Sequence, residues 1–429
     1  MYLHKKSLAS HESSGNLKLF RATIYQAGIK IKIEALKVSV GDVYDQLVDW
    51  RTEFSKWFTN EFKQIKFPST GTIFSFFIDP ETKKMLPWSE KVESFELDPD
   101  LPLQSCLVST SETTRIRFFM DLLIAKQKPV MLVGSAGSGK TVSVAAKLNS
   151  LPDSYAITNV PFNFYTTYDR QKLTLKDISN CMFMACMNPT AGSFTIDPRL
   201  QRHFCTFAVS FPALEACVQI YKQILSQHLN NPLNKFGLPV QKYADMLVNA
   251  ALALHNKLST SFLPTAIKFH YMFNLRDLSN IFQGMLFTTG DAIKLPSELI
   301  RLWMHEATRV YSDKMVDSTD NEAFQKLIME VIKKNCEEFD ENIVFEKPVI
   351  YCHFAEGIGD PKYLPIRDWP QIKKLLDESL AGYNDLVATM NLVLFEDAMY
   401  HICRRATSKN KFVRDVQPID PPVVYRHYA

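Results

Sequence analysis

One stretch of the sequence, GSAGSGKT at positions 134–141, combines three closely spaced glycines with a lysine and a hydroxyl side chain. It matches the phosphate-loop pattern G-x-x-x-x-G-K-[ST], with an apolar run before it and a helix-forming run after it, as that pattern requires. Glycines keep side chains away, so that many backbone N–H groups can approach a polyphosphate together. The residues expected to bind nucleotide are Gly134, Ser135, Ala136, Gly137, Ser138, Gly139, Lys140 and Thr141.

Two side chains of this loop have separate expected roles. Lys140 reaches the β- and γ-phosphates, and the Thr141 hydroxyl is a ligand for Mg²⁺. The implied cofactors are ATP or ADP together with Mg²⁺. The alternative is a chance match in a turn, which the two correct flanking elements disfavour.

Hydrolysis of the nucleotide needs carboxylates that the sequence does not supply near this loop. One carboxylate on Mg²⁺, and usually a second that polarises the attacking water, stand at the end of an apolar strand. Asp153 falls in a predicted loop, Asp169 has no apolar run before it, and Asp177 lies in a segment typical of a helix or turn. We therefore assign no catalytic residue and expect binding without efficient hydrolysis.

Composition narrows the class of protein. The chain has 429 residues, of which 46% are hydrophobic and 12% aromatic, and such a composition excludes a disordered chain. At roughly 150 residues per domain, the length indicates about two to four domains. A formal net charge of +3 is too small an excess for a nucleic-acid-binding protein, so we expect no nucleic-acid partner.

Cysteine spacing and apolar runs indicate where the chain resides. The eight cysteines form no CxxC pair and no zinc-finger spacing, which favours free thiols in a reducing compartment. The N-terminal region has no apolar core of a signal peptide. The longest apolar stretches fall far short of the roughly 18 residues that cross a bilayer, so we expect a cytoplasmic chain with no membrane partner.

The elements that position the loop predict an α/β layer followed by a helical bundle. Apolar β-type runs lie on both sides of the loop, whereas the sequence after Pro212 has helical periodicity. The predicted strands are residues 129–133, 156–165, 181–187 and 205–211, with a hairpin at 71–88. The predicted helices are residues 43–62, 110–126, 141–148, 213–228, 241–259, 275–287, 297–311 and 321–334.

A weak internal repeat concerns the ends of the chain. IDPETKKMLPW around Asp79 is echoed by GDPKYLPIRDW around Asp360. If the two copies are equivalent, the chain runs from the end of one module through a second to the start of a third. Coincidence is the alternative, and the sequence alone does not separate the two.

Several stretches together resemble the motor region of dynein heavy chains, and most closely axonemal, outer-arm-type ones. The resemblance extends over residues 43–404 and implies the third AAA+ module of the motor ring, with the end of the second before it and the beginning of the fourth after it. The stretches that carry it are PVMLVGSAGSGKT (129–141), ACMNPTAGSFTIDPRLQRHFCTFAVSFP (185–212), FLPTAIKFHYMFNLRDLSNIFQGML (262–286), LWMHEATRVYSDKMV (302–316) and HFAEGIGDPKYLP (353–365).

The resemblance implies further site residues outside the loop. Asn188 matches the first sensor, an amide near the γ-phosphate, and Arg276 matches the second sensor, which reaches the nucleotide from the helical subdomain. Arg202, with Arg199 as second choice, matches the arginine that points into the preceding module's site. A planar guanidinium suits phosphate oxygens. The alternatives are a surface salt bridge for Arg276 and an exposed loop charge for Arg202.

The implied fold class is an α/β P-loop AAA+ module, a parallel sheet with flanking helices that lacks the Walker B strand, followed by a helical-bundle subdomain. The implied domains are 1–42, a poorly matched segment; 43–105, the end of the preceding module with its hairpin; 106–212, the α/β subdomain; 213–345, the helical subdomain; 346–405, the start of the next module; and 406–429, a divergent tail.

The sequence departs from the family at two places. Around 167–168 a segment that includes an interior strand with paired aspartates is missing, and a parallel sheet without that strand has unpaired backbone groups. We expect either that the strand order closes up or that the module folds poorly. After Arg405 the sequence leaves the family pattern, and no second phosphate loop follows near position 415. Both departures suggest a truncated isoform, a splice product or a faulty gene model.

The function that the resemblance implies is a nucleotide-binding, regulatory AAA+ module of an axonemal dynein heavy chain. Its expected partners are neighbouring modules of the ring and subunits of the dynein complex, and microtubules only through the full-length chain. The expected location is the cytoplasm, the cytoskeleton and the ciliary axoneme. One alternative is a scaffold fragment that binds no nucleotide. Another is a small P-loop kinase or NTPase outside this family, for which no added catalytic base is found.

Overall fold

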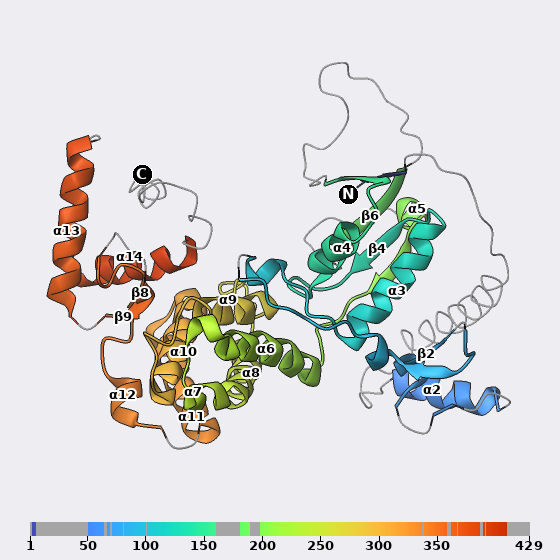
Figure 1. Cartoon of the computed structure of the whole chain (residues 1–429), viewed down its shortest axis with the longest axis horizontal. Helices are drawn as coiled ribbons and strands as arrows, with labels where there is room; N and C mark the ends of the chain where they lie inside the picture. The colour runs from blue at the N-terminus through green and yellow to red at the C-terminus, as the bar shows by residue number, and fades with distance from the viewer. Residues whose placement is uncertain are drawn as a thin grey trace, which may run out of the picture. The chain divides into compact units, whose positions relative to one another are not determined.

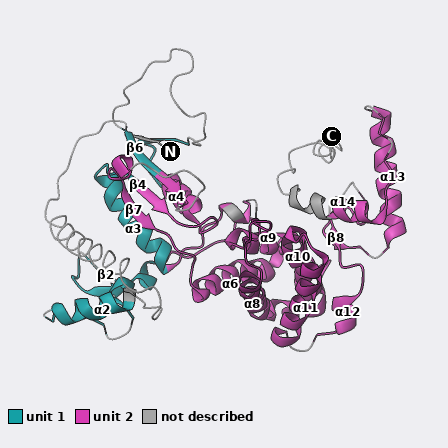
Figure 2. Cartoon of the chain, turned by 180° about the vertical axis from the view of Figure 1, so that it is seen from behind, with its two compact units in different colours: residues 1–92, 111–129, 150–184 teal, residues 93–110, 130–149, 185–429 magenta. Residues whose placement is uncertain are grey.

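The computed structural model of the chain consists of two compact units (Figure 2). One comprises residues 1–92, 111–129 and 150–184, and the other comprises residues 93–110, 130–149 and 185–429. Every residue predicted to bind nucleotide belongs to the second unit. The structure describes residues 2–5, 50–63, 67–68, 71–79, 81–99, 101–159, 181–188, 198–336, 339–357, 362–366, 368–386, 389–390 and 392–409.

The main sheet has five strands in the order β5-β1-β6-β4-β7 (Figure 1). In the second unit β4 and β7 pair in parallel, from Val130 opposite Cys205 to Val133 opposite Ala208. The apolar run of β4 is almost wholly buried, as expected for an inner strand covered on both faces. The strands are β1 (Tyr2–Lys5), β4 (Val130–Val133), β5 (Tyr155–Thr158), β6 (Cys181–Met187) and β7 (Cys205–Ala208).

Strand β1 was not predicted from the sequence. Its backbone pairs antiparallel with both neighbours, so that Tyr2 lies opposite Thr158 of β5 and opposite Phe183 of β6. The prediction that the strand order closes up was therefore wrong, because β1 lies between β5 and β6, whereas the alternative of a poorly folding module stays a prediction. Backbone groups of β5 and β6 pair with those of β1. They are therefore not left without hydrogen-bond partners, as they would be beside a gap in the sheet. Strand β5 also ends earlier than predicted, and residues 160–165 lie outside the described residues.

The first unit contains a hairpin that packs on a helix. Strands β2 (Phe76–Ile78) and β3 (Met85–Pro87) pair antiparallel. The hairpin leads to Trp88, which is buried and lies 5.3 Å from Phe118 between ring centroids. Phe118 belongs to α3 (Ser111–Ala125), close to the predicted helix.

Helix α2 (Trp50–Glu61) lies within the predicted helix of residues 43–62 and carries several aromatic side chains. Phe54, Trp57 and Phe58 are only half-buried, and they contact one another at centroid distances of 5.5–6.3 Å. The side chain of Trp50 and residues 43–49 lie outside the described part. The aromatics of α2 therefore form a small surface cluster in this unit.

The helical bundle predicted after β7 is confirmed, and it supplies most of the second unit's core. Apolar residues at helical spacing meet there, and Leu247, Phe282 and Trp303 have no exposed surface. A capping box of Asn274 and Asp277 fixes where α9 begins. The helices are α6 (Leu214–Asn230), α7 (Leu238–Lys242), α8 (Ala244–Ser261), α9 (Leu275–Met285), α10 (Pro296–Tyr311), α11 (Ser318–Asn335) and α12 (Glu341–Phe345).

The segment after the bundle contains a second antiparallel hairpin. Strands β8 (Tyr351–Cys352) and β9 (Leu364–Pro365) pair so that Tyr351 lies opposite Pro365, and in the first hairpin Phe76 lies opposite Pro87. Each copy of the sequence repeat thus contributes to an antiparallel hairpin, but the connection between the strands is longer in the second, and residues 358–361 lie outside the described residues, so equivalence of the two copies stays a prediction. Helices α13 (Trp369–Leu386) and α14 (Glu396–Lys409) follow. The predicted domain boundaries stay predictions.

Membrane-spanning helices are not found among the described residues, where none is both long and apolar enough to cross a bilayer.

Candidate nucleotide-binding site

The glycine loop lies between β4 and helix α4 (Lys140–Asn149), as the sequence predicted. Its first residue, Gly134, donates its backbone N–H to the carbonyl of Met187 at 3.2 Å. A Cβ atom on Gly134 would lie 2.1 Å from the carbonyl oxygen of Val209, so only glycine fits there. Gly139 has φ +83°, a conformation that glycine adopts without strain. The glycines therefore hold the loop against the ends of two neighbouring strands.

The loop keeps backbone donors available. Among the residues that the structure describes, none accepts a hydrogen bond from the backbone N–H of Ala136, Gly137 or Gly139. These groups directly precede the N-terminus of α4, where the helix dipole favours negative charge. Ser135 and Ala136 lie exposed at the tip, whereas Ser138 is buried. This donor set fits a polyphosphate.

Lys140 draws the loop and the predicted first sensor together. Its Nζ donates to the carbonyl oxygens of Gly134 at 2.8 Å and Ser135 at 2.6 Å, and to Oδ1 of Asn188 at 3.1 Å. Asn188 follows the last residue of β6. Burial lowers the pKa of the Lys140 ammonium. Phosphate oxygens are stronger, charge-assisted acceptors than these neutral groups, so a nucleotide can replace them as partners of Lys140.

The surroundings of Thr141 limit what can hold Mg²⁺. Its exposed hydroxyl lies beside the thiol of Cys186, an exposed residue of β6. Among the described residues, no carboxylate hydrogen-bonds Lys140, Thr141 or Asn188, and no cluster of three metal-ligating side chains occurs. Mg²⁺ often keeps waters and substrate phosphates as ligands. Among the described residues, Thr141 therefore fits as a protein ligand of a phosphate-bound Mg²⁺.

The predicted second sensor lies at the end of α9 that touches the loop. A Cβ atom on Gly137 would lie 2.8 Å from Cγ of Asn274, the residue that caps α9. Arg276 donates its backbone N–H to Oδ1 of Asn274 at 2.9 Å. Its exposed side chain has no hydrogen-bond or ion-pair partner within the described part of the chain, so the alternative of a surface salt bridge is not observed.

The two candidate trans-acting arginines lie on one exposed turn. Helix α5 (Pro198–Gln201) contains Arg199, and Arg202 follows it. The backbone N–H of Arg202 donates to the carbonyl of Pro198 at 3.1 Å, and its guanidinium lies 3.5 Å from His203. No described contact joins either arginine to the glycine loop. Both side chains are exposed, so their positions are compatible with a role outside this module's own site.

Two residues of the site were missed in the sequence. Asn274 could have been found as the start of a capping box, N-x-x-D, directly before a helical run. Cys186 stands two positions before Asn188, and side chains two apart share one face of a strand. Of the carboxylates considered, Asp153 lies in an exposed turn before β5, and Asp169 and Asp177 lie outside the described residues.

A phosphate loop between a strand and a helix, a polar residue at the tip of the neighbouring strand, and a helical lid against the loop define a module of the AAA+ class. Family comparisons agree with this class. A model described as "P-loop containing dynein motor region" matches residues 95–167 and 165–212, and one described as "AAA+ lid domain" matches residues 247–346.

Curated relatives identify the family. The chain is 53% identical over 422 residues to dynein axonemal heavy chain 17 of Homo sapiens, covering 84% of this chain and 9% of the relative. It is 52% identical to the ciliary dynein beta chain of Tripneustes gratilla, with 84% and 9% covered. It is 36% identical to the flagellar outer-arm dynein alpha chain of Chlamydomonas reinhardtii, with 83% and 9% covered. The chain belongs to the axonemal dynein heavy-chain family, and it spans about a tenth of the length of these relatives.

Proposed function

We propose that the chain is a nucleotide-binding AAA+ module of an axonemal dynein heavy chain, and that it regulates the motor without being the main hydrolytic site. The observation that carries this proposal is the set of contacts of Lys140, which joins the loop carbonyls to Asn188 beside backbone N–H groups that have no acceptor among the described residues. The Arg276 guanidinium, for which the described residues provide no partner, and the hydroxyl of Thr141 support roles as second sensor and Mg²⁺ ligand for ATP or ADP.

The position of the module in the motor ring is part of the proposal. An antiparallel hairpin precedes the glycine loop and another follows the helical bundle, which supports one whole module between parts of two others. The resemblance to dynein then favours the third module. Its partners would be the neighbouring modules and the dynein complex subunits, in the axoneme of a cilium, with microtubules reached only through the full-length chain. Arg202 or Arg199 would serve the preceding module's site.

The experiment that tests nucleotide binding is a thermal shift of the purified chain with Mg-ADP or Mg-ATP. A ligand that binds only the folded state stabilises it by about 2.7 kcal/mol at 100 times its Kd, so we expect a higher melting temperature at millimolar nucleotide. Mg²⁺ with inorganic sulfate is the control for a general salt effect. An unchanged melting temperature would favour the alternative function, a scaffold fragment without nucleotide.

ATP turnover is expected to stay at background even though nucleotide binds. The described residues place no carboxylate beside Lys140 or Thr141, and the two stretches that match the dynein motor model meet at residues 165–167, where the family's Walker B segment is expected. Phosphate release should be measured with the chain at micromolar concentration and saturating Mg-ATP. Turnover that Lys140→Ala abolishes would contradict the absence of a hydrolytic carboxylate.

A further inference from the structure

Helix α9 connects the nucleotide loop to a buried carboxylate at its other end. At the N-terminus Asn274 touches Gly137, as described above. Near the C-terminus Gly284 lies against Glu306 of α10, and a Cβ atom on Gly284 would lie 2.0 Å from Oε2 of that carboxylate. A helix of this length rises by about 1.5 Å per residue, so the two contacts are roughly 15 Å apart. One short helix therefore meets both.

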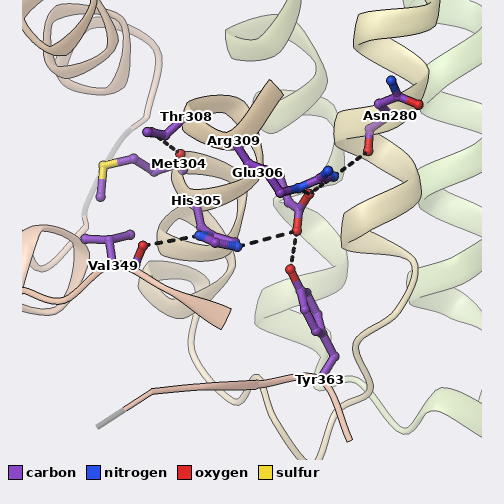
Figure 3. Close-up of polar contacts among 8 residues, drawn as sticks. All are labelled: Asn280, Met304, His305, Glu306, Thr308, Arg309, Val349 and Tyr363. Atoms are coloured by element: carbon purple, nitrogen blue, oxygen red, sulfur yellow. Dashed lines mark hydrogen bonds and ion pairs between the residues drawn. The ribbon is translucent and has the colours of Figure 1, made fainter. Parts of the chain in front are cut away.

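Glu306 has no exposed surface, and its hydrogen-bond partners are Arg309 of α10 and Tyr363 of the segment after the bundle (Figure 3). Arg309 of the same helix lies with Nη2 at 2.6 Å and Nε at 3.0 Å from Oε2. The same guanidinium donates to the carbonyl of Asn280 on α9 at 3.5 Å. Tyr363, which precedes β9, donates its hydroxyl to Oε1. Glu306 is thus the point where α9, α10 and the segment after the bundle meet.

The partner Tyr363 belongs to the hairpin segment that begins the predicted next module. Its ring is buried and lies 4.6 Å from His353 and 5.9 Å from Phe287, which follows α9 by two residues. Nδ1 of His305, beside Glu306, contacts the carbonyl of Val349 at 3.2 Å. Burial lowers the pKa of His353 to about 4, so that imidazole is neutral near pH 7. The contacts of this segment with α10 therefore include a hydrogen bond of Tyr363 to the Glu306 carboxylate and one between the neighbouring His305 and the carbonyl of Val349.

A buried carboxylate is an unusual residue at a contact between helices and a following segment if that contact needs only to be stable. Charges taken out of water cost free energy that pairing only partly returns, and apolar residues of similar volume often serve as well. Directional partners instead fix one arrangement of the joined elements. The close contact of Gly284 leaves no room for α9 to shift without moving Glu306, because packed interiors transmit small displacements.

We propose that α9 and Glu306 transmit nucleotide occupancy of the loop to the segment of residues 349–366, with Glu306 as the positioning residue. The inference rests on the proposed function, because nucleotide is its input. Phosphate in the loop attracts the Arg276 guanidinium, which has no partner among the described residues, and displaces Asn274; these residues are the first turn and the N-cap of α9. The helix moves as one body, and Gly284 passes the shift to Glu306 and from there to Tyr363.

Hydrogen exchange with and without Mg-ADP tests this connection in the full chain. In the unmodified protein we expect slower exchange at 349–366 as well as at 134–141, by about fivefold or more if the coupling has the usual size. Tyr363→Phe removes one hydroxyl far from the loop, so nucleotide should bind with unchanged Kd while the response at 349–366 is lost. Tyr351→Phe is the matched control, since its hydroxyl donates to the carbonyl of Glu298 at 3.3 Å and does not contact Glu306.

The possible outcomes distinguish failure of the proposed nucleotide binding from failure of the connection through α9. Failure of the unmodified chain to bind Mg-ADP, measured by calorimetry, would overturn both. Binding without a response at 349–366, or a response that Tyr363→Phe retains, would overturn the connection alone. If Tyr363→Phe lowers the melting temperature, Glu306→Gln provides the second variant: it keeps an acceptor for Tyr363 and removes the charge that holds Arg309. A full response in Glu306→Gln would then contradict the positioning role.

Discussion

Lys140→Ala is expected to abolish the stabilisation of the chain by Mg-ATP and Mg-ADP. The ammonium donates at 2.6–3.1 Å to two loop carbonyls and to Asn188, so it stands where it can bond phosphate oxygens and the sensor amide together. A hydrogen bond to a charged group contributes about 1.5–3 kcal/mol, and a tenfold change in Kd corresponds to about 1.4 kcal/mol. The affinity should fall by roughly 100-fold when at least one such bond is lost. Calorimetric titration gives the Kd directly.

A charge-matched control separates loss of the site from loss of one positive charge. Lys126 is exposed after α3, so Lys126→Ala should leave the Kd within a factor of about two, as for surface charges in general. Because Lys140 also holds the loop, the melting temperature of Lys140→Ala without nucleotide must be compared with that of the unmodified chain. Equal affinities of the Lys140→Ala variant and the unmodified chain would mean that the loop is not the nucleotide site.

Gly284→Ala is expected to destabilise the helical bundle severely, although alanine normally favours a helix. The added methyl group would lie 2.0–2.6 Å from three atoms of the Glu306 carboxylate, which has no exposed surface. Overpacking costs about 1–3 kcal/mol, and displacing a buried carboxylate from its partners costs about 3–5 kcal/mol. The free energy of unfolding, from urea titration followed by helical circular dichroism, should fall by at least about 3 kcal/mol.

The chain contains a matched control for this substitution. Gly382 is also a helical glycine, in α13, but it is exposed and no atom lies within 4 Å of the position of its Cβ. Gly382→Ala should stabilise the chain slightly, by up to about 1 kcal/mol, through helix propensity alone. In the double variant Gly284→Ala with Glu306→Ala the clash is removed, so part of the loss should return. Similar effects of Gly284→Ala and Gly382→Ala would show that the packing against Glu306 is not tight.

The part of the site that local sequence specifies was predicted well. The glycine loop, its preceding strand and its following helix are neighbours along the chain, and the spacing of glycines and Lys140 is fixed by one turn. Asn188 was placed by resemblance, and the structure brings its side chain to Lys140. Roles in nucleotide binding stay predictions for the residues of the loop, for both sensors and for Arg202 and Arg199.

What the sequence did not reveal depends on contacts between distant segments. Pairing of β1 with β5 and β6 joins residues far apart in the chain, and no local pattern specifies such partners. Glu306 reads as an ordinary polar position of an amphipathic helix, and only the approach of Gly284 and Tyr363 shows that it is buried. Asn274 had a local signal as a helix cap, but its contact with Gly137 is again long-range.

The contact between Gly137 and Asn274 bears on how such loops diverge. Position 137 is one that the phosphate-loop pattern leaves open to any residue. Here it has φ +78° and the lid's cap directly above it, so a side chain is excluded twice. Substitutions in this loop are thus filtered by the lid as well as by the nucleotide. Substitutions at residue 137 and at residue 274 should therefore be correlated among related modules. A module that acquires a different lid would have to change this glycine with it.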